Sequence, residues 1–548
     1  MKNKPYDLYE IPLIQNLKDM IIQKKEHKPD DIAFTYSKGR NQVVKKTYGE
    51  FYDEVNALGT WLHNQNLQGK HIAVIGENSY EWLVCFFAIV CGGGVAVPID
   101  KELPDKEIKN LLQKADVRAI IYSKSYIDVA ENAVEMLSQS TEQKNVNDFK
   151  AYSMADLESF LVEGKELLAS GNRSFVDYQI DRKKMCCIMF TSGTSGSCKG
   201  VMLSHENIAE DINSSCQLFV LEGNTIAVLP FHHAFGLVVA VFMVFHYGYT
   251  IYINRSLKAI QKDLQIAKPQ TMFLVPLFVE TFHKQIWTTA KKEGKEKLLK
   301  RMMKFSDFLL KLGVDLRKKI FTSVRQAFGG ETEYIICGGA PLGTQYIKEF
   351  RSWGIEILNG YGTTECAPCA AVNRNHFHKD GTVGVAVPGA HMSIGEDGEV
   401  FIKGSIVMMG YYKDDNATNE VLKDGWYATG DLGFVDEEGF LTLTGRKKNL
   451  IILSNGENVS PEELESDFLK YEAVQEVLVY EQSQTIVAEI YPDTDYLKEN
   501  DSDVDVQEYF DNIRSEVNRN RPIYKQVGEI LLRDSEFPKN TSKKILRY

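Results

Sequence analysis

The stretch MCCIMFTSGTSGSCKG, residues 185–200, joins an apolar segment to a glycine-rich loop. Its first half is uniformly apolar, as expected for a parallel strand that helices cover on both faces. Its second half consists mostly of glycine and small hydroxylated residues, whose exposed backbone N–H groups suit an anionic phosphate. It is not a Walker A loop, because no glycine immediately precedes Lys199 and no Ser or Thr follows it. The stretch therefore predicts a strand followed by either a phosphate-binding loop or a flexible surface loop.

The same pattern of apolar strand, turn and helix recurs around this stretch, from about residue 70 to residue 365. It predicts a doubly wound α/β fold. The expected strands are HIAVIGE, VAVPI, RAIIYS, TIAVLP, YTIYI, TMFLVP and YIICGG, and the expected helices span residues 107–115, 206–219 and 344–353. After residue 380, glycine-punctuated segments such as GEVFIKG and GFLTLTG predict antiparallel strands of a small β-barrel.

A separate α+β unit is expected after GRKKN, residues 445–449. It would contain the helix PEELESDFL, the strands VQEVLVY and TIVAEIY, and a final helix. With 548 residues the chain is long enough for several folding units. We expect an N-terminal domain at residues 1–446 and a C-terminal domain at residues 447–548.

Composition narrows the function classes. A net charge of -12 argues against a protein that coats nucleic acid by bulk charge. The nine cysteines lack the density of a disulfide scaffold, and no apolar region follows the N-terminal charges, so a cytoplasmic location is expected. Cys366 and Cys369 are expected to be packing residues, since no second ligand pair stands at zinc spacing.

The uncharged runs 82–99 and 236–253 contain glycine or proline, which favours a buried helix followed by a strand over a membrane span.

Four further segments carry polar residues suited to a nucleotide site. They are NGYGTTE at 359–365, YATGDLG at 427–433, GRKKN, and PKNTSKKILR at 538–547. The first combines an aromatic ring, hydroxyls and a carboxylate, a set suited to stacking a base and holding a hard cation. The second places Asp431 between glycines, where it would accept hydrogen bonds from ribose. Taken singly, each segment is equally typical of a polar loop, a β-turn or solvated lysines.

Taken together, in this order and at these separations, the segments resemble the adenylate-forming superfamily of acyl-CoA synthetases, adenylation domains and luciferases. GENSYEWLVCFFAIVCGGGVAVPIDKELP, LPFHHAFG, KPQTMFLVPLFVE and FGGETEYIICGGAPL look most like bacterial long-chain fatty-acyl-CoA synthetases. The resemblance covers about residue 40 to the end. It implies a large N-terminal domain of two α/β subdomains and a β-barrel subdomain, with a small mobile C-terminal domain hinged near Lys448.

The resemblance also implies roles for individual residues. The β- and γ-phosphates of ATP would be bound by Thr191, Ser192, Gly193, Thr194, Ser195, Gly196 and Lys199. The residues that would contact adenine are Tyr361, Gly338, Gly339, Ala340, Asn359 and Gly360. Asp431 and Arg446 would bind ribose, and Thr364 would contact the α-phosphate. Glu365 with Thr191 would hold Mg²⁺. Lys544 matches the catalytic lysine of adenylation. His233 matches a histidine near the acyl carboxylate, although a core histidine is the alternative.

The implied reaction is fatty acid + ATP + CoA → acyl-CoA + AMP + diphosphate, through an acyl-adenylate. In its second half the C-terminal domain would rotate about Lys448, withdraw Lys544 and bring Gly456 to the pantetheine channel. The alternative is an enzyme that loads an acyl carrier protein or activates an aryl acid. One departure from the pattern is Lys543, which stands where the superfamily usually has glycine. We expect activity to survive it, since Lys544 is present.

Residues 284–325 are rich in Lys and Arg and helical in pattern, although the chain as a whole is acidic. A solvated helical hairpin is one interpretation. The other is a face that contacts an anionic membrane, which would place the enzyme peripherally on the inner side of the membrane. Nucleic acid is not expected as a partner. A homodimer is compatible with the sequence.

Overall fold

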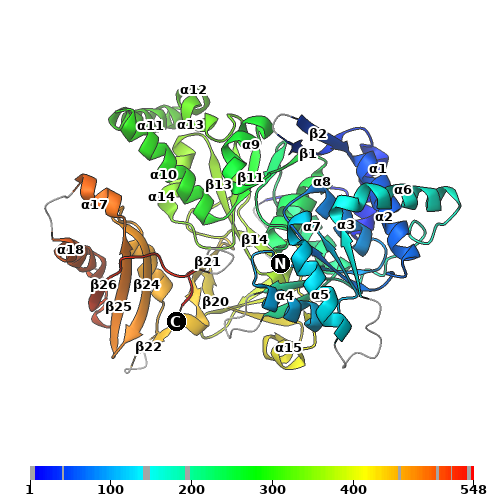
Figure 1. The fold of residues 1–548 in the computed structure, drawn as a ribbon. Helices are drawn as coiled ribbons and strands as arrows, with labels where there is room; N and C mark the ends of the chain where they lie inside the picture. The colour runs from blue at the N-terminus through cyan, green and yellow to red at the C-terminus, as the bar shows by residue number, and fades with distance from the viewer. Residues whose placement is uncertain are drawn as a thin grey trace.

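The computed structural model describes residues 6–39, 42–139, 149–191, 198–453, 458–500, 505–519, 521–539 and 545–547. Two helix-covered sheets and an antiparallel sheet make up the larger part, and the C-terminal residues form a separate layer of strands and helices (Figure 1). Within these residues, no helix combines the length and the apolarity needed to cross a membrane.

The apolar segment before the glycine-rich loop forms β7 (Met185–Thr191), which lies within a sheet of order β18–β8–β7–β4–β3–β5–β6. It pairs in parallel with β4 and antiparallel with β8. Alternate residues of β3 enter two different cores, Ile72 and Val74 into one and Ala73 and Ile75 into the other. Burial of both faces explains why these strands read as uniformly apolar. The strands are β3 (His71–Ile75), β4 (Val95–Pro98), β5 (Ala119–Tyr122), β6 (Lys150–Ser153), β8 (Lys199–Ser204) and β18 (Gly410–Tyr411).

A second sheet has the order β15–β14–β13–β12–β11–β9–β10–β1–β2. Its strands from β13 to β1 run parallel, and antiparallel strands close both edges. The two sheets confirm the doubly wound α/β prediction. The strands are β1 (Ile32–Lys38), β2 (Gln42–Thr47), β9 (Thr225–Ala227), β10 (Ile251–Ile253), β11 (Thr271–Leu274), β12 (Tyr334–Cys337), β13 (Glu356–Gly362), β14 (Cys369–Val372) and β15 (Val385–Ala386).

The antiparallel strands expected after residue 380 are present. They pair in the order β16–β17–β20–β19, with β21 on β20. Their bounds are β16 (His391–Ile394), β17 (Glu399–Lys403), β19 (Leu422–Lys423), β20 (Trp426–Val435) and β21 (Leu441–Arg446).

Residues from Ile451 to Ile530 pack into a core of their own, which supports the α+β unit predicted at the C-terminus. The division at residue 446 itself stays a prediction. The elements are β22 (Ile451–Ile452), β23 (Asn458–Val459), α16 (Pro461–Phe468), β24 (Val474–Gln482), β25 (Thr485–Pro492), α17 (Thr494–Asn500), α18 (Val506–Asn518) and β26 (Glu529–Leu532).

The three helices expected in the α/β region are α4 (Asp105–Lys114), α7 (His205–Leu218) and α14 (Thr344–Ser352). Both uncharged runs are a helix followed by a strand, as predicted: α3 (Tyr80–Val90) precedes β4, and the π-helix η4 (Phe235–Met243) with α8 (Val244–Tyr247) precedes β10. Other helices are α1 (Leu17–His27), α2 (Tyr48–Asn64), α5 (Ile127–Gln139), α6 (Leu157–Ala169), α9 (Ile260–Ala267), α10 (Pro276–Lys292), α11 (Glu296–Lys311), α12 (Arg317–Ile320), α13 (Thr322–Gln326) and α15 (Asp415–Val421).

Candidate active site

Two predicted adenine contacts lie side by side because β12 and β13 are parallel neighbours. Cys337, the last residue of β12, pairs in register with Asn359 of β13, so Gly338 and Gly360 follow at the same edge of the sheet. A Cβ atom at Gly338 would lie 3.5 Å from the Gly360 carbonyl oxygen and 3.4 Å from Cζ of Phe235. Gly339 has a φ of +85°, which glycine adopts without strain. The structure therefore brings these glycines together at the carboxyl ends of the strands, where α/β proteins bind ligands.

Asp431 forms the centre of a polar cluster next to these glycines. It pairs in register with Arg446 across the β20–β21 ladder, and its Oδ1 lies 2.8 Å from Arg446 Nε. The hydroxyl of Tyr361, which lies at the end of β13, donates to Asp431 Oδ2 at 2.7 Å. Burial, and then the charge of Asp431, hold the pKa of Tyr361 well above its usual range, so the phenol stays protonated and donates. The predicted ribose and adenine residues are thus in direct contact.

Glu365 belongs to a second cluster that includes the base of the glycine-rich loop. It lies on the short helix η6 (Thr364–Cys366), which follows β13 directly and also carries Thr364. Tyr411 donates its hydroxyl to Glu365 Oε1 at 2.9 Å, and its ring lies 4.8 Å from Lys199 Nζ. Thr191 pairs in register with Lys199 at the end of the β7–β8 hairpin. One aromatic side chain therefore joins the predicted metal ligand to the predicted phosphate-binding lysine.

The two clusters adjoin, because Tyr361 lies near the end of β13 and Glu365 lies on η6, which follows that strand. Burial and then the charge of Glu365 raise the pKa of Tyr427, on β20, well above its usual range. Asn359, at the start of this edge, accepts two hydrogen bonds from Asn373 through its carbonyl, at 2.9 and 3.2 Å. Backbone pairing between β12 and β13, between β20 and β21, and between β7 and β8 therefore fixes the positions of the site residues.

His233 lies beside a buried histidine and a carboxylate. The rings of His232 and His233 have centroids 4.3 Å apart, and His232 Nε2 lies 3.3 Å from Asp100 Oδ1. Burial and then the neighbouring His233 lower the pKa of His232, while Asp100 opposes this. The three side chains offer ligand atoms within 4.8 Å of one another. Because Asp100 is within hydrogen-bonding range of the His232 ring, it orients the pair.

The apolar helix after these histidines contributes one residue to the site. Gly236 to Met243 are buried, and the Phe242 ring is tilted against Phe86 and edge-on to Phe87, at centroid distances of 5.5 and 5.0 Å. Phe235 is only partly buried, and its ring faces Gly338. Of the segment 231–245, Phe235 is therefore the side chain placed to meet a substrate at these glycines.

Lys448, the expected hinge, lies on η7 (Lys447–Asn449) between β21 and the C-terminal core. Burial and the nearby Arg446 lower its pKa. Hydrogen bonds tie both sides of this segment to the start of α16: Ser460 donates to the Thr444 carbonyl at 2.7 Å, and Asn449 donates to Glu462 at 2.5 Å.

Several predicted site residues lie outside the described part of the chain: Ser192, Gly193, Thr194, Ser195, Gly196, Gly456 and Lys544. Lys543, which departs from the superfamily pattern, also lies outside it. Ala340 is described and exposed. The two cysteines assigned to packing, Cys366 and Cys369, have thiol pKa values raised by burial, as expected for packing residues.

Sequence reasoning missed Tyr411 and Asp100. Tyr411 reaches the site through β18, which pairs with β8 from far along the chain. Asp100 follows β4, and a carboxylate at the end of a predicted parallel strand was a usable signal for it.

A family model described as AMP-binding enzyme matches residues 22–412. A long-chain-fatty-acid–CoA ligase of Mycobacterium bovis, FadD15, is 27% identical over 486 residues, covering 85% of this chain and 80% of that protein. Two solved structures share the fold. An anthranilate CoA ligase, AuaEII, in complex with anthranoyl-AMP is 18% identical with a TM-score of 0.77, and the match covers 98% of this chain and 96% of that chain. The o-succinylbenzoate coenzyme A synthetase of Bacillus subtilis in complex with ATP and magnesium ion is 22% identical with a TM-score of 0.71, and the match covers 96% of this chain and 98% of that chain.

Proposed function

Because the chain belongs to the AMP-binding enzyme family, we propose that it activates a carboxylic acid with ATP and transfers the acyl group to the thiol of coenzyme A. We propose further that the acid is a medium- to long-chain fatty acid, released as acyl-CoA with AMP and diphosphate. The observation that carries the proposal is the junction of two clusters at one sheet edge: Tyr361, Asp431 and Arg446 in one, Glu365, Tyr411 and Lys199 in the other.

The first cluster is suited to a nucleoside. Its carboxylate has further lone pairs for ribose hydroxyls, and the tyrosine ring adjoins the glycine edge on which a flat base can lie. The second cluster is suited to the polyphosphate. Lys199 supplies a cation, and the backbone after Thr191 is the candidate cradle for the β- and γ-phosphates.

Glu365 and Thr191 fit Mg²⁺, which prefers hard oxygen ligands and is held by few carboxylates together with substrate phosphates. The fit rests on the placement of a carboxylate and a hydroxyl on either side of the Tyr411–Lys199 contact. When bound, the ion would neutralise phosphate charge during adenylation. Tyr411 would hold Glu365 in its orientation by donating to Oε1.

Adenylation brings together the acid carboxylate, the α-phosphate and the departing diphosphate. We propose that Lys544 neutralises this charge, that Thr364 contacts the α-phosphate, and that His233, oriented through His232 and Asp100, adjoins the acid carboxylate. Thiolysis would follow a rotation about Lys448 of the C-terminal domain, residues 447–548, which brings Gly456 to the thiol channel.

Two observations support the fatty-acid assignment. One is the similarity to the M. bovis ligase, and the other is that the uncharged aromatic ring of Phe235 faces Gly338. The second candidate substrate is an aryl acid, favoured by the fold shared with the anthranilate ligase. An acyl carrier protein is the alternative acceptor. A homodimer stays a prediction.

The test is release of AMP and diphosphate from ATP and Mg²⁺ over a series of saturated acids from acetate to palmitate, together with benzoate and anthranilate, with and without coenzyme A. The proposal expects AMP formation that needs both acid and coenzyme A and that peaks at a medium or long chain. A maximum with an aryl acid would overturn the substrate assignment. Acid-dependent diphosphate exchange without coenzyme A-dependent turnover would overturn coenzyme A as the acceptor.

A further inference from the structure

The helix α11 exposes a row of large apolar side chains on its outer side. Leu298, Phe305 and Phe308 are 53%, 57% and 58% exposed, and Leu312, directly after the helix, is 64% exposed. Leu298, Phe305 and Leu312 are spaced by seven residues, so they lie on one face, and Phe308 lies one turn from Phe305. The opposite face buries Leu299 and packs against the protein. The outer row is therefore apolar surface beyond what the fold itself uses.

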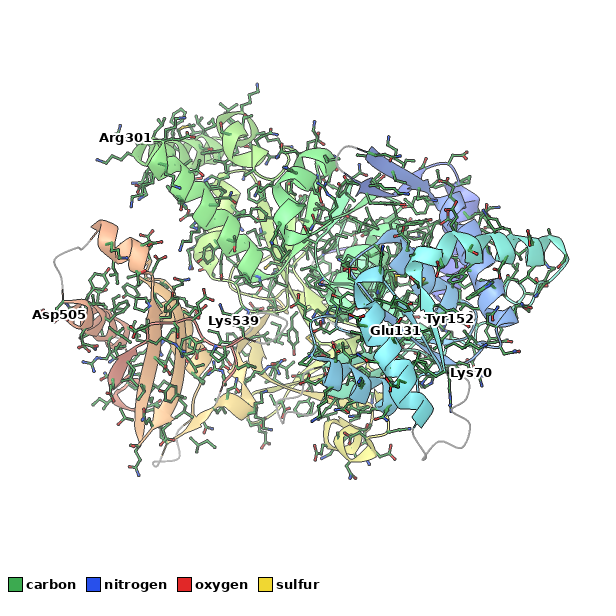
Figure 2. All side chains as sticks on the ribbon, in the orientation of Figure 1. Lys70, Glu131, Tyr152, Arg301, Asp505 and Lys539 are labelled. Carbon is green, nitrogen blue, oxygen red and sulfur yellow. The ribbon has the colours of Figure 1, made fainter. Side chains whose placement is uncertain are left out.

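A second row on α11 is basic. Lys297, Lys304 and Lys311 follow the same seven-residue spacing, one position before each apolar residue, and Arg301 lies between the rows. Figure 2 shows Arg301 at the outer edge of the molecule, directed away from it. No carboxylate in the described part of the chain forms an ion pair with these four side chains. We call these eight residues, Lys297, Leu298, Arg301, Lys304, Phe305, Phe308, Lys311 and Leu312, the α11 outer face.

The basic character is local. Residues 296–319 contain eight Lys or Arg against three Asp or Glu, in a chain whose net charge is -12. Helix α11 lies with α12 and α13 at the upper edge of the molecule in Figure 1, and the C-terminal strands lie below them. The α11 outer face is thus a cationic and apolar patch on a protein that is otherwise acidic.

We propose that the α11 outer face docks on the surface of an anionic lipid bilayer. Phe305, Phe308 and the two leucines would enter the boundary between head groups and acyl chains, as the apolar face of an interfacial helix does. The lysines would keep their ammonium groups at the level of the anionic head groups while their aliphatic stems cover apolar surface. The apolar row would then lie in apolar surroundings and the basic row beside anionic groups.

A bilayer fits this surface better than a second copy of the chain or a nucleic acid. In a twofold dimer the face would meet itself, and its cations would lie against one another. A duplex would pair with the cations but leave Leu298 and Leu312 in water. The inference adds to the proposed function without resting on it: docking would bring the enzyme to acids dissolved in the bilayer, but it requires no catalysis.

The test is co-flotation of the full-length protein with large unilamellar vesicles, without substrates. Phosphatidylcholine vesicles are compared with vesicles that contain phosphatidylglycerol at about a third of the lipid, at low and high salt. The variants are Phe305→Ser with Phe308→Ser, and Arg301→Glu with Lys304→Glu. The matched control is Val162→Ser with Lys165→Glu, an exposed apolar and basic pair on α6. Thermal melting shows that each variant is folded.

Binding to the anionic vesicles that weakens at high salt is expected, because exposed charges are screened. Reversing two basic residues changes the charge by four units, and at roughly fivefold for each unit the partition coefficient should fall about 600-fold. Removing two phenylalanines should lower it about tenfold or more. The control should bind like the parent protein.

Three results would overturn the proposal: no binding of the parent protein to anionic vesicles, binding that both α11 variants retain, or loss of binding in the α6 control as well. A concentration-dependent dimer in sedimentation that the α11 variants abolish would assign the face to self-association instead. Because no substrate is present, these results are independent of the proposed reaction.

Discussion

Arg547 holds the last described residues on the C-terminal core, and its removal tests how firmly they are attached. Its Nη2 lies 2.5 Å from Glu465 Oε2 on α16, and its Nη1 donates to the Val479 carbonyl at 3.2 Å. The amide of Leu546 donates to the Pro538 carbonyl at 2.9 Å. Lys544, the proposed catalytic lysine, stands three residues before Arg547 in the sequence.

Arg547→Gln should weaken this attachment by about 2–3 kcal/mol, the worth of a hydrogen bond to a charged group. The Glu465 side chain is only 12% exposed, so loss of the guanidinium leaves a mostly buried carboxylate without its cation. A free-energy change of this size raises the opening constant of the Leu546 hydrogen bond roughly 30- to 150-fold. Hydrogen–deuterium exchange of the C-terminal peptide measures this change.

The effect should depend on pH. Burial raises the pKa of Glu465 from its ordinary value of 4.5 to about 7, while Arg547 acts to lower it. Because the folded-state pKa is raised, the folded protein holds this proton between about pH 4.5 and 7, and the associated stability is lost as the pH rises through that window. As the pH falls below 7, Glu465 becomes neutral, and the positive charge of Arg547 then contributes less to holding the two side chains together. The variant-to-parent exchange ratio should therefore be larger at pH 8 than at pH 6.

Arg514→Gln is the matched control, since Arg514 pairs with Asp511 at 3.2 Å in the same unit, away from the terminal contact. Adding Glu465→Gln to Arg547→Gln should restore part of the loss, because the unpaired charge is then gone. An exchange ratio near one at both pH values, or one that is equally large at both, would refute the argument.

Three further predictions concern the active site. Lys544→Ala should lower acyl-adenylate formation by about 10²- to 10³-fold, because one transition-state electrostatic contact is lost; unchanged diphosphate exchange would contradict the assignment. Tyr411→Phe removes the donor that orients Glu365 and should raise the Mg²⁺ concentration for half-maximal activity about tenfold, with no change in the KM of the acid; an unchanged Mg²⁺ titration would count against this role. Gly338→Val places methyl groups against Phe235, and kcat/KM should fall more for palmitate than for octanoate; an equal fall for both acids would show that this edge does not sense chain length.

The fold could be predicted from local patterns because its central strands are buried on both faces. Ile72 and Ala73 are both apolar although they face opposite sides, and this signal depends on no distant residue. The placement of Tyr361 and Glu365 at one edge of the sheet also followed from the sequence, since Tyr361 lies at the end of β13 and Glu365 lies just past it. Tyr411 and the contact of Arg547 with Glu465 could not be predicted, because each depends on pairing between segments far apart in the chain. A single sequence holds no record of such pairings.

Both oxygens of Asp431 are already engaged in the structure, one with Arg446 and the other with Tyr361. A carboxylate has about four lone-pair sites, so ribose hydroxyls can add to it while both contacts remain. The β20–β21 ladder fixes the backbone of Asp431 and Arg446, and burial keeps Tyr361 protonated. The proposed binding of a nucleoside would therefore require little reorganisation at this cluster, and binding energy from the nucleotide would remain available for placing the reacting groups.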